Sequence, residues 1–165
     1  MGNLPHALAI ATGLVGATVV IHMVGLDLLM RLTRLHLRWF LSVWHDLDRL
    51  LVPMGIVTGL FVLHGAEIWL YAFAYKALGL LPTIEAALYY STVAYSTLGE
   101  GGAPLPTDWR ILGALEAING MLMLGWSTAF LFQVLSHLLE PGEAHALPKG
   151  AISRTARRER VQQSS

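Results

Sequence analysis

The chain has 165 residues, of which 55% are hydrophobic and 13% are charged, and its mean hydropathy is +0.55. This composition excludes an ordinary soluble domain and indicates a membrane protein with one domain by length. Acidic and basic residues are equal in number and cysteine is absent, so the sequence predicts no nucleic-acid-binding face, no disulfide framework and no thiolate chemistry.

The first apolar segment, from Ala7 to Leu26, contains no Asp, Glu, Lys or Arg. Its length suits a helix that crosses the ~30 Å hydrocarbon core of a bilayer, so residues 1–30 are predicted to form an N-terminal transmembrane helix. His22 lies inside this span. A membrane histidine can be a proton or metal site, but a packed histidine with one hydrogen bond is the simpler interpretation.

Residues 31–50 mix arginines with tryptophan and leucine, which predicts an amphipathic interfacial segment in the headgroup region. A voltage sensor is the alternative interpretation of the arginines. It is disfavoured because a sensor needs a regular array within a moving span, and because Asp46 and Asp48 follow closely.

The second span is predicted from Leu50 to Tyr75, with Pro53 in its first turn, where a missing N–H is harmless. His64 and Glu67 are three residues apart on one helical face, so we expect an intramembrane polar pair. A buried carboxylate must be paired, protonated or turned toward water. Structural anchoring is the simpler role for this pair, and gating or proton sensing is the alternative.

The third span is predicted from about Ile111 to Leu139. The segment between the second and third spans is too apolar for an ordinary loop, so we expect it to enter the membrane and return. Irregular backbone is tolerated at that depth only where protein buries it or where it lines a watery cavity. Within this segment, Thr83 is predicted to cap a short helix that has Glu85 in its first turn and runs to about Tyr95.

The residues after this short helix resemble a known motif. Thr97, Leu98, Gly99, Glu100 and Gly101 are similar to the selectivity filter of the potassium-channel superfamily, which reads Thr-Val-Gly-Tyr-Gly or a close variant. Both glycines and the threonine match, leucine is an accepted variant, and the glutamate replaces Tyr or Phe. The resemblance extends over roughly residues 52–139 and is to the pore module of small two-transmembrane channels, here with an extra N-terminal helix.

This resemblance implies an all-α membrane protein with three transmembrane helices, a re-entrant pore helix and a filter loop, assembled as a homotetramer. Residues 51–139 would form the pore module, and the filter residues would bind permeant K⁺ through backbone oxygens. Potassium and, in addition, sodium are the only metal ions implied; no cofactor or enzymatic activity is expected. The function implied is passive cation conduction.

Three departures from the motif weaken the expected discrimination against Na⁺. Glu100 cannot brace the filter as an aromatic ring does, Gly102 stands where an Asp is usual, and Val93 aligns with a frequent pore-helix carboxylate. The Glu100 carboxylate has two alternative places: the outer mouth, or a buried site where its hydrogen-bond partners would be Tyr90, Ser91, Tyr95 or Trp109.

Gly120 follows the last filter glycine by about the distance at which the superfamily's inner helix often bends, so it is a candidate gating hinge. Close helix packing is an equally good interpretation of this glycine.

Basic residues gather in two regions, 31–50 and the tail 140–165. The positive-inside rule places both in the cytoplasm, so we expect a multi-pass protein of the cell membrane with its N-terminus outside and its C-terminus cytoplasmic. The basic segments are also expected to attract anionic lipids. The basic residues concerned are Arg31, Arg34, Arg38, Arg49, Lys149, Arg154, Arg157, Arg158 and Arg160.

Two other functions remain open at this stage. A membrane enzyme is disfavoured because no span carries a His-Asp or Ser-His pair at catalytic spacing. A non-conducting accessory or scaffold subunit, which uses a degenerate pore loop for packing, is the stronger alternative.

Overall fold

The computed structural model describes residues 4–40, 45–99 and 105–139. This part of the chain contains helices and no strand, which confirms the all-α prediction for it. The elements in chain order are α1 (Leu4–Phe40), α2 (His45–Ala77), α3 (Ile84–Tyr95), the short 3-10 helix η1 (Thr107–Trp109) and α4 (Arg110–Leu139).

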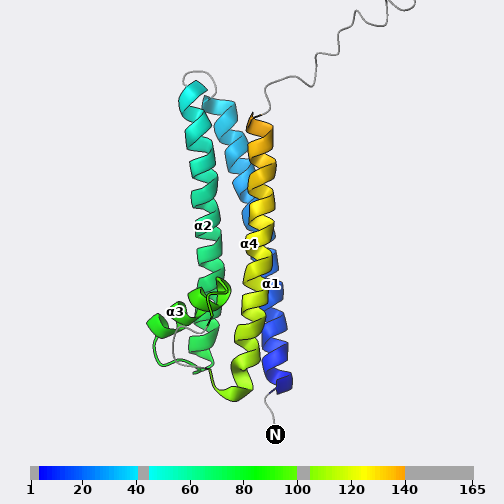
Figure 1. Cartoon of the computed structure of the whole chain (residues 1–165), viewed down its shortest axis with the longest axis vertical. Helices are drawn as coiled ribbons and strands as arrows, with labels where there is room; N and C mark the ends of the chain where they lie inside the picture. The colour runs from blue at the N-terminus through cyan, green and yellow to red at the C-terminus, as the bar shows by residue number, and fades with distance from the viewer. Residues whose placement is uncertain (1–3, 41–44, 100–104, 140–165) are drawn as a thin grey trace, which may run out of the picture.

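Helices α1, α2 and α4 lie side by side along the long axis of the molecule (Figure 1). Each contributes to a helical segment that is long and apolar enough to cross a membrane. These segments are Leu4–His36, Leu51–Ala77 and Thr107–Ser136, the last of which begins with η1. The three predicted spans are therefore confirmed by length and composition. The short α3 lies near the N-terminus of α1, at one end of the bundle. The C-terminal ends of α1 and α4 lie at the opposite end (Figure 1).

Two boundaries differ from the sequence-based expectation. Helix α1 continues through residue 30 without a break, so residues 31–40 extend the first helix. Helix α2 begins at His45, which places Pro53 inside the helix and makes the prediction of a first-turn proline wrong. The expected boundaries followed the ends of the apolar segments. A helix can extend past the apolar segment that crosses the bilayer, into flanking polar and basic residues.

Helices α1 and α2 approach closely at two glycines. The side chain of Leu63 lies over Gly25, where an added Cβ would be 2.3 Å from it, and the side chain of Leu29 lies over Gly59 at 2.5 Å. A leucine of each helix thus packs directly against a glycine of the other. Such close contact is how membrane helices gain packing energy, since lipid tails are as apolar as leucine.

A polar contact also joins α1 to α4. The Asn119 Nδ2 group donates to Thr18 Oγ1 at 2.7 Å, and both side chains are buried. The Tyr71 hydroxyl of α2 lies 3.4 Å from the same amide nitrogen. Interhelical hydrogen bonds of this kind help to fix the register of the three helices.

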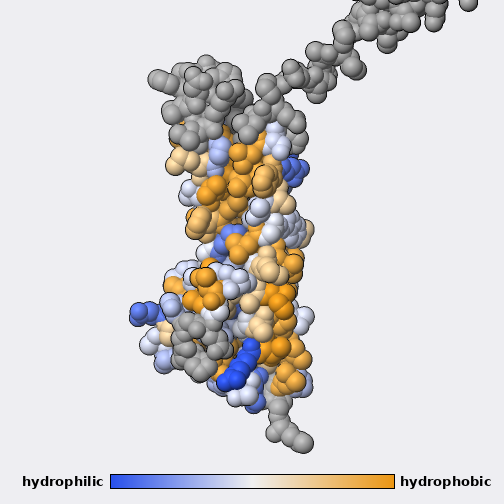
Figure 2. All heavy atoms as spheres, in the orientation of Figure 1, coloured by the Kyte–Doolittle hydropathy of each residue, from blue (hydrophilic) through white to orange (hydrophobic). Residues whose placement is uncertain are grey.

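The outer surface is largely apolar. Figure 2 shows hydrophobic side chains along much of the visible face of the bundle. Phe61 is 77% exposed and Phe132 is 70% exposed in the single chain. Large exposed apolar side chains over helices of this length suit contact with lipid or with further protein chains.

Candidate functional site

Helix α3 starts where the sequence predicts. Thr83 has an extended backbone, and its side chain accepts a hydrogen bond from the Ala86 N–H at 3.1 Å. Glu85 lies in the first turn, where negative charge interacts favourably with the helix dipole. With 12 residues the helix is ~18 Å long, which is too short to span a bilayer.

The helix ends at Tyr95 in a Schellman turn. The Thr97 N–H donates to the Ala94 carbonyl at 3.0 Å, and the Leu98 N–H donates to the Val93 carbonyl at 3.1 Å. This turn needs a left-handed residue, which is usually glycine, but here it is Thr97 with φ +59°. A β-branched residue in this conformation is strained, at a cost of about 1–2 kcal/mol.

The same turn fixes the direction of two carbonyl groups. In a trans peptide the C=O of one residue points opposite to the N–H of the next, and no cis peptide occurs in the described ranges. Because the N–H groups of Thr97 and Leu98 both point back into α3, the carbonyl oxygens of Ser96 and Thr97 both point away from it. Two adjacent hard oxygen ligands therefore face the same way beyond the helix end.

Three of the five predicted filter residues are described. Thr97, Leu98 and Gly99 are exposed and follow the helix as non-helical chain, and Gly99 has φ +93°. The Leu98 side chain is 80% exposed. Glu100 and Gly101 lie outside the described residues.

Two buried carboxylates on the flanking helices bind side chains of α3 and hold it in place. The first is Glu116 of α4. The Ser91 hydroxyl of α3 lies 2.5 Å from Glu116 Oε1, and the Tyr75 hydroxyl of α2 donates to Glu116 Oε2 at 2.5 Å. Ser91 Oγ is also 2.9 Å from the Ile68 carbonyl oxygen of α2. The middle of α3 is thereby tied to both of its neighbours.

The second carboxylate is Glu67 of α2, which lies at the end of α3. The Tyr95 hydroxyl donates to Glu67 Oε2, and His22 Nδ1 of α1 lies 2.9 Å from Glu67 Oε1. His64 Nδ1 lies 2.9 Å from the Tyr95 hydroxyl and 3.4 Å from Glu67 Oε2. His64 and Glu67 are thus adjacent, as their spacing suggests, within a larger cluster that includes His22.

Gly120 lies against the end of α3. A Cβ built on it would be 2.2 Å from the Tyr95 carbonyl oxygen and 2.9 Å from the Tyr95 Cα. This contact is with backbone, which cannot move aside as a side chain can. The glycine therefore lets α4 and the last turn of α3 touch, which favours the packing interpretation of this residue.

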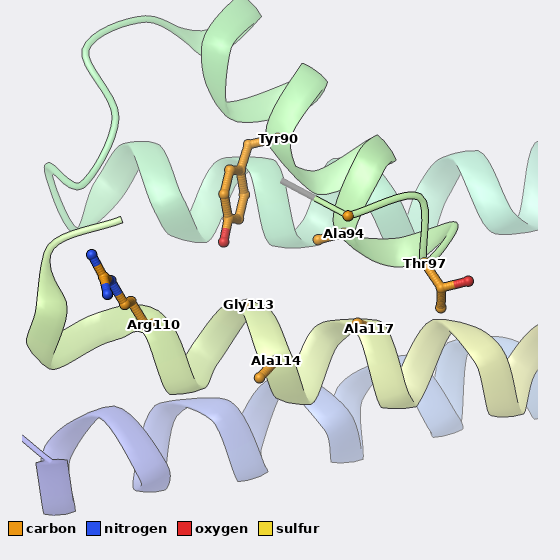
Figure 3. Close-up of a pocket in the computed structure, with 8 residues that line it drawn as sticks. Tyr90, Ala94, Thr97, Arg110, Gly113, Ala114 and Ala117 are labelled. Atoms are coloured by element: carbon orange, nitrogen blue, oxygen red, sulfur yellow. The ribbon is translucent and has the colours of Figure 1, made fainter. Parts of the chain in front are cut away.

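A cavity of about 400 Å³ opens between α3 and α4. In Figure 3 Tyr90, Ala94 and Thr97 face Arg110 and Ala117 across it. The other lining residues are Gly99, Gly113 and Ala114. The turn that follows α3 is therefore accessible along one face of α4.

Sequence reasoning missed Glu116, Ser91 and the part that His22 plays. Their partners are 25 and 45 residues away in sequence, so no local spacing relates them. One signal was available: an ionisable group inside a membrane helix is costly and needs a partner, and α1, α2 and α4 each carry at least one such group.

The geometry defines a class: a helical membrane protein with a short helix and a non-helical turn held between two spanning helices. A family profile described as ion channel matches residues 54–137, from α2 through most of α4, and no curated protein or solved structure matches the chain. The chain belongs to this family of two-transmembrane, potassium-channel-like ion channels. The resemblance inferred from Thr97–Gly101 is confirmed at the level of the family, and all of α1 lies outside the matched residues.

Proposed function

We propose that this chain is the pore-forming subunit of a homotetrameric cation channel that conducts K⁺ and discriminates weakly against Na⁺. The observation that carries the proposal is the end of α3, where the Ser96 and Thr97 carbonyl groups point the same way beyond a helix too short to span. The negative end of the α3 dipole favours a cation at this place.

One chain supplies only one such strand, so a ring of oxygen ligands needs several copies. Four copies are inferred from the family resemblance. The exposed Leu98 side chain and the open cavity beside Thr97 and Gly99 supply a surface that a neighbouring subunit can cover.

We place Glu100 at the outer mouth. Two of the buried partners that it would need, Ser91 and Tyr95, already bond to Glu116 and Glu67. A further carboxylate among these groups would add a desolvated negative charge beside two others. At the mouth, four copies make an acidic ring that concentrates cations and favours block by divalent ions.

The carboxylate contacts also bear on selectivity. Glu67 and Glu116 bond to Tyr95 and Ser91, so they fix the pore helix itself, whereas the Val93 side chain can make no hydrogen bond to a filter strand. In this proposal the pore helix is firmly held, but no pore-helix carboxylate supports the filter strand. Such an arrangement is consistent with a channel that conducts K⁺ and discriminates weakly against Na⁺. We propose a cell-membrane location, with the N-terminus and the filter end outside and the C-terminus cytoplasmic.

Reconstituted protein under bi-ionic K⁺/Na⁺ conditions tests the proposal. We expect a reversal potential close to zero, and we expect Glu100→Tyr to move it toward the potassium limit. The matched control is Glu85→Gln, which removes the exposed carboxylate in the first turn of α3 and should leave the reversal potential unchanged. A wild-type reversal potential near the potassium limit would refute weak selectivity.

The same preparation separates the channel from an accessory subunit. Cation flux into proteoliposomes that barium or a quaternary ammonium ion blocks supports the channel. A tetramer that admits neither K⁺ nor Na⁺ would identify the chain as a non-conducting scaffold and overturn the proposal.

A further inference from the structure

We propose that His22, His64 and Glu67 form a binding site for a divalent transition-metal ion of the Zn²⁺ class. The ligand atoms of these three side chains all lie within 4.8 Å of one another. Two imidazole nitrogens with one carboxylate are a ligand set that Zn²⁺ uses in proteins. This site is separate from the filter and does not depend on the proposed conduction.

Two of the ligand-atom distances are close to the spacing around a tetrahedral ion. With metal–ligand bonds of about 2.0–2.1 Å, neighbouring ligand atoms of such a site are roughly 3.3 Å apart. His22 Nδ1 lies 2.9 Å from Glu67 Oε1, and His64 Nδ1 lies 3.4 Å from Glu67 Oε2. The two distances involve different oxygens of the carboxylate, so the side chains must shift to bring both nitrogens and the carboxylate around one ion.

A fourth oxygen is in place. The Tyr95 hydroxyl contacts Glu67 Oε2 and lies 2.9 Å from His64 Nδ1. It can complete the coordination itself or hold a water molecule there. The bound ion would join α1, α2 and the last residue of α3.

The opposite sides of the two histidine rings supply a second argument. His22 Nε2 and His64 Nε2 both face the Ser127 hydroxyl, at 3.4 Å and 3.0 Å. A metal-binding histidine usually donates its other ring N–H to an oxygen, which fixes the tautomer and leaves the first nitrogen free for the metal. The Ser127 oxygen can accept from both rings, so both Nδ1 atoms then present lone pairs to the centre.

Burial also suits a bound ion. His22 and Glu67 are fully buried and the His64 side chain is 13% exposed in the single chain, so protein surrounds most of the cluster. The competing description is a hydrogen-bond network that holds no ion. In that network, hydrogen bonds from the Tyr95 hydroxyl, the Ser127 hydroxyl and the histidine rings satisfy the polar atoms that would otherwise bind the ion or support its ligands.

Zn²⁺ titration of the purified, chelator-stripped full chain, with a fluorescent chelator as competitor, distinguishes the two descriptions. We expect one high-affinity ion per chain, and a loss of affinity on the order of 100-fold or more in His22→Ala. Ser127→Ala keeps all the ligands and should lower the affinity about 10-fold. The matched control is His6→Ala, an exposed histidine of α1 outside the cluster, which should bind as the wild type does.

X-ray absorption on the zinc-loaded wild type keeps the test independent of whether a variant folds. We expect nitrogen and oxygen ligands at about 2.0–2.1 Å, with the scattering signature of two imidazoles. Failure of the wild type to retain zinc, a spectrum without imidazole ligands, or unchanged affinity in folded His22→Ala would each overturn the metal site in favour of the hydrogen-bond network.

Discussion

Replacement of Gly120 by alanine tests whether this glycine is a packing contact or a hinge. The added Cβ would lie 2.2 Å from the Tyr95 carbonyl oxygen, whereas ordinary contacts begin at 3.4 Å. The end of α3 or the α4 backbone must therefore move by about 1 Å. The control is Gly125→Ala on the same helix, because a Cβ there meets nothing within 4 Å.

The expected magnitude follows from two opposing effects. Overpacking of a close contact costs about 1–3 kcal/mol. Both variants gain about 0.5–1 kcal/mol, since alanine loses less backbone entropy than glycine when a helix forms. The packing penalty falls on Gly120→Ala alone, so the free energies of unfolding of the two variants should differ by about 1–3 kcal/mol.

Thermal unfolding in detergent, followed by circular dichroism at one scan rate, measures the difference. At about 2–4 °C per kcal/mol for a chain of this size, Gly120→Ala should melt about 2–12 °C below Gly125→Ala. Cation flux should fall in Gly120→Ala because Tyr95 lies two residues before Thr97, where the proposed filter begins. Equal melting temperatures for the two variants would refute the packing argument and return the hinge as the explanation.

Three further substitutions probe α3 and its ends. Thr83→Ala removes the N-cap and should destabilise the protein by about 1 kcal/mol in a denaturant titration, and an unchanged midpoint would contradict the capping role. Ser91→Ala deprives the buried Glu116 of one partner and should cost about 1–3 kcal/mol, whereas Ser136→Ala, an exposed hydroxyl that bonds within its own helix, should be neutral. Thr97→Gly should raise the melting temperature because it relieves a strained left-handed residue; a lower melting temperature would show that the strain is absent.

The local features of the chain could be predicted from the sequence. The start of α3 follows from Thr83 and the positive φ of Gly99 follows from glycine's freedom, whereas the left-handed Thr97 in the turn after α3 could not be predicted. The three spans follow from apolar length, which a bilayer imposes directly. Each of these inferences depends on a few neighbouring residues, so one sequence is sufficient.

The long-range contacts could not be predicted in the same way. Spacing within one helix pairs His64 with Glu67, but the partner His22 is on another helix, and its contact depends on how α1 packs beside α2. The same holds for Ser91 and Glu116, and for Thr18 and Asn119. Burial on a bundle axis is set by helix rotation and register, which hydropathy does not encode in a chain that is apolar on all sides.

A cryo-electron microscopy map of the full chain in K⁺ is the most direct test of the central claim. We predict four copies around one axis, with separated ion densities along that axis at the level of Thr97 to Gly101 and the Thr97 carbonyl groups turned toward them. A monomer, or a tetramer whose axis is filled by side chains at this level and holds no ion density, would contradict the account.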